Sequence, residues 1–306
     1  MHRPYLAFHV PPRVLYTGNT KRGTSPAVLI HEGCFWRSYK LQVGPSIAQP
    51  GVLDPRGVVS WKHNGGDKKA LKADEHKLKG YKVRTWRLWG ETGKEYVHEV
   101  KRNREAGEGV DPDVPSESAT ELREKPCRPV IADEVVYLRW TAPLSRQTRC
   151  YHFHYRGIEF QWKGTGTVKE SRRCGLFLRY NHLKLVAKLP LAGDEKTAAQ
   201  LDICLGKFTS SVAKFKSGTL ELYDTAILRL CEEHLPSMLT AAADPFGDGV
   251  SKLEGRDEQV LRLKKSTLYH VFVATALCMI KSEKEKRHTL LDLIAHAGEG
   301  GGGAGG

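Results

Sequence analysis

Short runs rich in Val, Ile, Tyr, Phe and Trp recur along most of the chain, separated by turn-forming residues. This pattern is typical of antiparallel strands joined by hairpins. In the first half it predicts strands at 27–30, 35–43, 58–62, 82–88 and 95–100. In the second half it predicts strands at 135–140, 150–155, 158–163, 175–180, 182–189, 201–208 and 219–230. Only Arg156-Gly157 separates two of these runs, and only Asn181 separates another two, so tight hairpins are expected there.

One segment near the C-terminus departs from this pattern. From Leu268 to Ile280 the apolar residues fall on every side of a helix rather than along one stripe. Such a helix must be buried on all sides. Ser266 or Thr267 can cap its N-terminus, and lysines beyond Ile280 suit the negative end of the helix dipole. At about 1.5 Å per residue the apolar part is about 20 Å long, too short to span a bilayer.

This order of parts, hairpins from Val135 to Leu230 and then Leu268–Ile280 with its charged exit, resembles the Tubby C-terminal-like superfamily. That superfamily includes the LURP-one-related proteins and the phospholipid scramblases. The resemblance implies a mainly β fold, a closed antiparallel β-barrel around a buried hydrophobic C-terminal α-helix. Closure would also remove the exposed edges of so many short strands. It implies that His270 and Thr275, the polar residues of the helix, find partners inside the barrel.

The domain organisation follows from the same division. The chain has 306 residues and is 40% hydrophobic, which is sufficient for a packed core. We expect an N-terminal extension at 1–24, a single Tubby-like domain at 25–290 with a loop at 232–258, and a disordered glycine-rich tail at 291–306. Acidic residues and three prolines dominate 105–126, which is expected to be a disordered insertion. Whether this insertion lies within one barrel or separates two domains stays open.

Charge is distributed unevenly along the chain. The formal net charge is +13, and fourteen basic against six acidic residues between Arg56 and Arg104 account for +8 of it. The densest part, 67–79, is expected to be a loop between strands. The candidate anion-binding residues are Lys68, Lys69, Lys72, Lys77, Lys79, Lys82, Arg84 and Arg87. They predict a partner that is an anionic lipid headgroup, such as a phosphoinositide, or a protein. A solvated loop is the simpler alternative, and non-specific nucleic-acid binding is a further one.

A second constellation suggests metal chemistry. Within Cys150–Tyr155, alternation places His152 and His154 on one strand face, and Glu159 follows. This resembles part of the first cupin motif and raises the alternative of a small metal-dependent enzyme. The glycine that precedes the motif and the second cupin motif are both missing from the sequence. Because a catalytic metal needs three or four converging ligands, half-exposed strand histidines are the expected interpretation, with no metal bound.

Other catalytic signatures are incomplete or missing in the sequence. Gly164-Thr-Gly166 lacks the third glycine and the following helix of a nucleotide fingerprint, and no GxSxG elbow occurs. We therefore expect a non-enzymatic binding module without a cofactor. The first residues do not form a secretory signal, and the seven cysteines are scattered without a CxxC pair. These features favour a cytoplasmic protein, attached peripherally to a membrane, with the nucleus as an open alternative.

Overall fold

The protein is represented by a computed structural model that describes residues 11–18, 24–33, 38–53, 57–60, 68–81, 129–140, 150–164, 182–190, 200–210, 218–237 and 255–299. The chain divides into two compact units. Unit 1 comprises Met1–Glu32 and Lys40–Val136, and unit 2 comprises Gly33–Tyr39 and Tyr137–Gly306. The predicted strands at 82–88, 95–100 and 175–180 and the acidic insertion at 105–126 lie outside the described residues.

Nine strands form one sheet in which spatial order follows chain order, β1 to β9. They are β1 (Arg13–Thr17), β2 (Ser25–Glu32), β3 (Ser38–Val43), β4 (Glu134–Trp140), β5 (Cys150–Tyr155), β6 (Ile158–Gly164), β7 (Leu183–Pro190), β8 (Gln200–Ser210) and β9 (Gly218–Leu222). Among the described residues, the helical elements are the 3₁₀ turn η2 (Pro45–Ala48) and the helices α1 (Lys68–Ala73), α3 (Asp224–His234), α5 (Arg256–Lys265) and α6 (Thr267–Glu299). The prediction of a mainly β protein is confirmed.

The predicted closed barrel is wrong. Among the described strands β1 and β9 are the two edges of the sheet, and they do not pair with each other. The last predicted strand, 219–230, ends at Leu222, and its remainder forms α3. Ile227, Leu230 and Cys231 are buried on one side of α3, and their spacing of three and four residues is the helical repeat. β9 is therefore a short strand of five residues that leaves one edge of the sheet open.

Unit 1 is built around a small apolar core. Its strands contribute Val14 and Leu29, both fully buried. The irregular segments that follow β3 contribute the rest of the cluster: Ile47, Val52, Val59, Leu78, Val130 and Ala132. Isolated bridges join these segments at Leu53–Val59, Ser60–Tyr81 and Lys77–Ile131. Segments distant in sequence are thus fixed by burial more than by regular ladders.

The clearest part of unit 2 is the hairpin of β5 and β6. Tyr155 pairs with Ile158 across a turn of two residues, Arg156 and Gly157, which confirms the predicted tight hairpin. Both turn residues have positive φ, 48° and 82°, as in the type I′ turn that suits the twist of a hairpin. Alternate side chains along both strands point to one buried face. They are Tyr151, Phe153, Tyr155, Ile158, Phe160 and Trp162.

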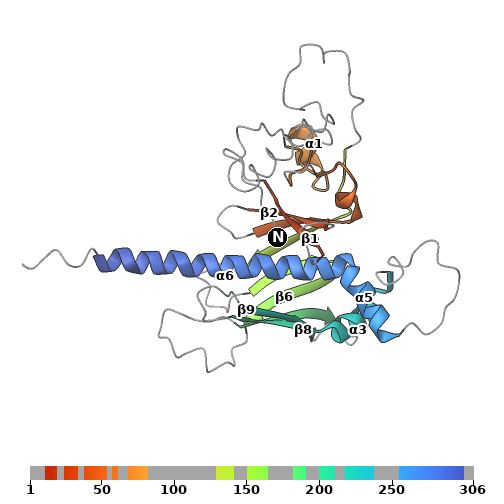
Figure 1. Ribbon diagram of the computed structural model, residues 1–306. Coiled ribbons are helices and arrows are strands. Elements are labelled where there is room, and N and C mark those ends of the chain that lie inside the picture. The colour runs from red at the N-terminus through yellow and green to blue at the C-terminus, as the bar shows by residue number, and fades with distance from the viewer. Residues whose placement is uncertain are drawn as a thin grey trace, which may run out of the picture. The chain divides into compact units, whose positions relative to one another are not determined.

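Helix α6 packs on this buried aromatic face. The ring of Phe272 makes edge contacts with Phe153 and Phe160 at centroid distances of 6.3 and 5.1 Å. Figure 1 shows α6, in blue, running past β6, with α5 at its beginning. The buried side chains of its first turns lie on one broad face and include Leu268, Val271, Phe272, Ala274, Ala276, Cys278 and Met279. The predicted helix is present, but its predicted burial on all sides is wrong, because Val273, Leu277 and Ile280, spaced four and three residues apart, form a half-buried stripe on the other side.

Two polar side chains, one before α6 and one within it, form hydrogen bonds that fix the helix. Ser266 is the cap, since its Oγ accepts a hydrogen bond from the backbone N–H of Tyr269 at 3.3 Å. Buried Thr275 donates to the backbone oxygen of Phe272 at 3.0 Å and accepts from the indole N–H of Trp162 at 3.1 Å. The hydroxyl thus ties the helix to β6. The helix continues to Glu299, beyond the predicted end at 281.

We predict that Phe272→Ala destabilises unit 2 by about 3–5 kcal/mol, because it removes a large buried side chain and leaves a cavity between β5 and β6. Urea unfolding of the full chain measures the loss. The matched control is Lys284→Ala on the exposed side of the same helix, which should change the free energy of unfolding by less than about 0.5 kcal/mol. Equal effects of the two substitutions would contradict the burial of α6.

Candidate functional site

Four lysines of unit 1 form the candidate site and are called the lysine surface: Lys69, Lys72, Lys77 and Lys79. Part of the predicted loop at 67–79 is instead the short helix α1, whose Lys-Lys-Ala-Leu-Lys-Ala sequence contains good helix formers. Lys69 and Lys72 are three residues apart and so lie on one side of α1. Of the other predicted anion-binding residues, Lys68 begins α1, and Lys82, Arg84 and Arg87 lie outside the described residues.

The backbone after α1 is held by the core of unit 1. Leu78 is fully buried, and its N–H donates to the oxygen of Val130 at 3.1 Å. The N–H of Ala132 donates to the oxygen of His76 at 2.8 Å. Because the chain is extended here and Leu78 points into the core, Lys77 and Lys79 on either side of it point outward.

A buried glutamine on β3 also holds this stretch. The side-chain NH₂ of Gln42 lies 2.8, 3.3 and 3.0 Å from the backbone oxygens of Glu75, His76 and Lys77. Its side-chain oxygen faces Nε2 of His31 at 2.8 Å. Since the amide oxygen can only accept, His31 donates from a protonated Nε2.

The environment of His31 keeps its imidazole neutral. Desolvation is the main cause and lowers the pKa of His31 to about 4, with the positive charges of Lys40 and Lys79 acting in the same direction. The hydrogen bond to Gln42 opposes this shift. The hydrogen bond to Gln42 requires only that Nε2 carry a hydrogen, and burial keeps the ring otherwise neutral.

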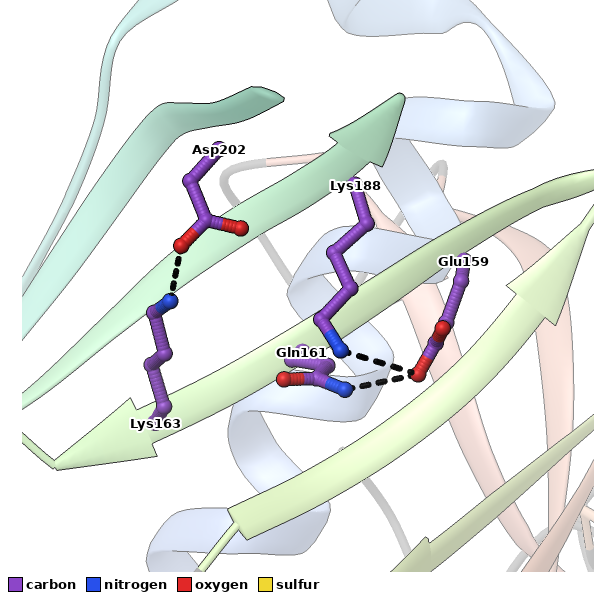
Figure 2. A network of polar contacts seen from close by, with 5 residues as sticks. All are labelled: Glu159, Gln161, Lys163, Lys188 and Asp202. Atoms are coloured by element: carbon purple, nitrogen blue, oxygen red, sulfur yellow. Dashed lines mark hydrogen bonds and ion pairs between the residues drawn. The ribbon is translucent and has the colours of Figure 1, made fainter. Parts of the chain in front are cut away.

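Three lysines of the sheet in unit 2 form ion pairs with carboxylates on other strands. Three ion pairs cross the strands β6 to β9: Lys163–Asp202, Lys188–Glu159 and Lys207–Glu221. The nitrogen–oxygen distances are 3.7 Å in the second pair and 3.0 Å in the third. Figure 2 shows the first two pairs, with Gln161 also donating to Glu159. On this face of the sheet, Lys163, Lys188 and Lys207 are each paired with a carboxylate.

The lysine surface has a different electrostatic character. In the described part of the chain, no carboxylate lies within 4.0 Å of the ammonium nitrogen of Lys72, Lys77 or Lys79. Lys79 instead lies over the ring of Tyr81, 5.2 Å from its centroid.

The two acidic residues of this stretch, Asp74 and Glu75, act on Lys40. Desolvation lowers the pKa of Lys40, and the charges of Glu75 and then Asp74 oppose that shift. The acids are therefore associated with a partly buried lysine of β3, and Lys72, Lys77 and Lys79 have no ion pair among the described residues.

The HxH pair has the predicted placement but no metal-binding set. His152 and His154 share the face of β5 opposite its buried aromatics, and His154 pairs with Glu159 across the hairpin. The carboxylate of Glu159 accepts from Gln161 at 2.6 Å and lies 3.7 Å from Lys188. Within the described ranges, no group of three His, Cys, Asp or Glu residues is placed to hold a metal ion.

The charge environment of His152 also differs from that of a metal ligand held by carboxylates. Desolvation lowers its pKa, Glu159 opposes this shift, and His154, Arg139 and Lys188 add to it. Several cations around one imidazole disfavour a bound cation.

Sequence reasoning did not identify Gln42 or His31. Their partners lie between 11 and 35 residues away in the chain, so no local pattern marks them. Gln42 also lies in a strand end, Leu41–Val43, that is buried on both faces, where alternation carries no information.

Comparison with known proteins gives no relative. No protein-family model matches the chain, and no curated protein or solved structure matches it. Among the helices that the structure describes, none is long and apolar enough to span a membrane.

We predict that His31 makes stability sensitive to acid. Its folded pKa, about 4, is below the value of 6.5 expected when unfolded, so its contribution is complete above about pH 6.5 and is lost as the pH falls towards 4. The loss should reach up to about 3 kcal/mol. His31→Gln keeps a donor for Gln42 but cannot titrate, so its urea midpoints should fall less between about pH 7 and about pH 4. Parallel pH curves for the two proteins would refute this assignment.

Proposed function

We propose that the protein is a non-enzymatic module that binds an anionic surface through the lysine surface, with anionic phospholipids, phosphoinositides among them, as the ligand. One observation carries this proposal. Lys72, Lys77 and Lys79 are presented from a fixed backbone without a carboxylate partner among the described residues, whereas Lys163, Lys188 and Lys207 in unit 2 are paired.

The energetics suit reversible attachment. A lysine near an anionic leaflet contributes about 1 kcal/mol, so four acting together supply about 4 kcal/mol. Attraction of this kind is screened over a Debye length of about 10 Å at moderate salt. Holding the backbone in advance reduces the ordering cost of binding. The expected behaviour is peripheral, salt-sensitive association from the cytoplasmic side of a membrane.

The resemblance to Tubby-like proteins is part of this proposal. It is supported by the mainly antiparallel sheet and by α6, whose buried apolar face packs on β5 and β6 through Phe272. The closed barrel is not retained. The lysine surface does not depend on closure of the sheet into a barrel. The backbone that carries it is held by the core of unit 1 and by the hydrogen bonds of that segment.

An acidic protein partner and a nucleic acid are the competing ligands for the same lysines. Binding of either ligand would be as sensitive to salt as binding of lipid. The three ligands are therefore distinguished by testing which of them the protein binds. The metal-dependent enzyme has no support from the geometry of His152, His154 and Glu159.

We predict that the full chain floats with vesicles of phosphatidylcholine and phosphatidylserine mixed three to one, and more strongly when a phosphatidylinositol bisphosphate is added. Changing Lys69, Lys72, Lys77 and Lys79 together to Gln should reduce the bound fraction at low salt by at least about tenfold, because the change removes an attraction of about 4 kcal/mol. Binding should also weaken steeply as salt is raised.

The matched control changes the same number of charges elsewhere: Lys163, Lys184, Lys188 and Lys207 to Gln. This variant should float nearly as well as the original chain. Equal losses in both variants would show that net charge alone drives binding. Absence of flotation at low salt, or preference for an acidic protein or RNA over vesicles, would reject lipid as the ligand.

A further inference from the structure

We infer that Gln42 is a positioning residue that fixes the backbone carrying Lys77 and Lys79, and so sets the geometry of the lysine surface. Its importance for binding rests on the proposed function, whereas its effect on the backbone does not. Gln42 is 1% exposed and reaches no solvent-facing part of that surface, so it acts through the backbone and not on a ligand.

The side chain can lie in only one orientation. Its NH₂ group faces three backbone oxygens, so the reversed amide would place its oxygen against all three. His31 fixes the other end by donating to the amide oxygen at 2.8 Å. The amide is therefore satisfied on both sides, as a buried polar group must be.

The three carbonyls are consecutive, from Glu75 to Lys77, so one side chain on β3 holds a whole turn of the chain. The oxygen of His76 has a second donor in the N–H of Ala132. Within the described part of unit 1, the hydrogen bonds given to the oxygens of Glu75 and Lys77 come from Gln42.

The hydrogen bonds from Gln42 matter for the lysine surface because they hold the segment that carries two of its lysines. The carbonyl of Lys77 is itself a partner of Gln42, and Lys79 follows two residues later. Loss of the hydrogen bonds from Gln42 would leave the oxygens of Glu75 and Lys77 without these donors, so the segment would move to hydrogen-bond with water instead. The lysine side chains would then start from a mobile backbone, and fewer of them would meet an anionic surface at the same time.

The test compares Gln42→Met, which is close in volume but has no donor, with the milder Gln42→Asn, which is too short to reach all three oxygens. Val52→Ala serves as the control. Val52 is 1% exposed, lies in the apolar cluster of unit 1, and has a side chain that forms no hydrogen bond. Amide hydrogen exchange of the full chains is followed at Leu78 and Ala132, whose N–H groups tie this segment to residues 130–132.

Either Gln42 variant should speed exchange at Leu78 and Ala132 by about tenfold or more relative to amides of β1 and β2. Val52→Ala should instead raise exchange evenly across unit 1. Uniform acceleration in the Gln42 variants, or none, would overturn the positioning role even if vesicle binding were lost. If Gln42→Met fails to fold, the exchange comparison is made with Gln42→Asn.

Binding to the three-to-one phosphatidylcholine–phosphatidylserine vesicles supplies the second measurement. A positioning role predicts that Gln42→Asn weakens binding and flattens its dependence on salt, since fewer lysines engage together, whereas Val52→Ala leaves the dependence unchanged. An unchanged salt dependence would contradict a role of Gln42 in binding. If the original chain does not bind these vesicles, the proposed function fails and the exchange data alone decide the positioning role.

Discussion

The broad apolar face of α6 must be covered, and this constraint organises unit 2. The aromatic face of β5 and β6 meets α6 through Phe272, and a single buried hydroxyl on Thr275 joins helix and strand through Trp162. Because strand side chains alternate, burying one face of the hairpin leaves the other for polar residues. The histidines of β5 and the ion pairs across β6 to β9 lie on that second face.

The two units therefore differ in how they treat positive charge. Strand pairing in unit 2 places Lys188 opposite Glu159 and Lys207 opposite Glu221, and Lys163 reaches Asp202 across β7. In unit 1 the chain is irregular, and its lysines lie on a short helix and an extended segment whose acidic neighbours act on Lys40. Net charge alone would not distinguish these sets of lysines. Their partners do, and this difference is the physical basis of the proposed anionic ligand.

The parts of the fold that could be predicted from the sequence are those with an uninterrupted local pattern. Alternation identified β5 and β6 and their turn, and the apolar run identified the buried part of α6. The barrel was wrong because Ile227, Leu230 and Cys231 have helical spacing within a run that is also rich in strand-forming residues. The charge pattern identified the lysines, but it could not show which of them are paired. Gln42 and His31 could not be predicted at all, since their contacts join segments 11 to 35 residues apart.

Lysine-directed acylation of the full chain, mapped by mass spectrometry with and without phosphatidylserine-containing vesicles, tests most directly which lysines meet an anionic surface. If the lysine surface is the contact, Lys69, Lys72, Lys77 and Lys79 become protected when vesicles are present, and Lys163, Lys188 and Lys207 keep their reactivity. Protection centred on the sheet of unit 2, or equal protection of both sets, would contradict the proposed function.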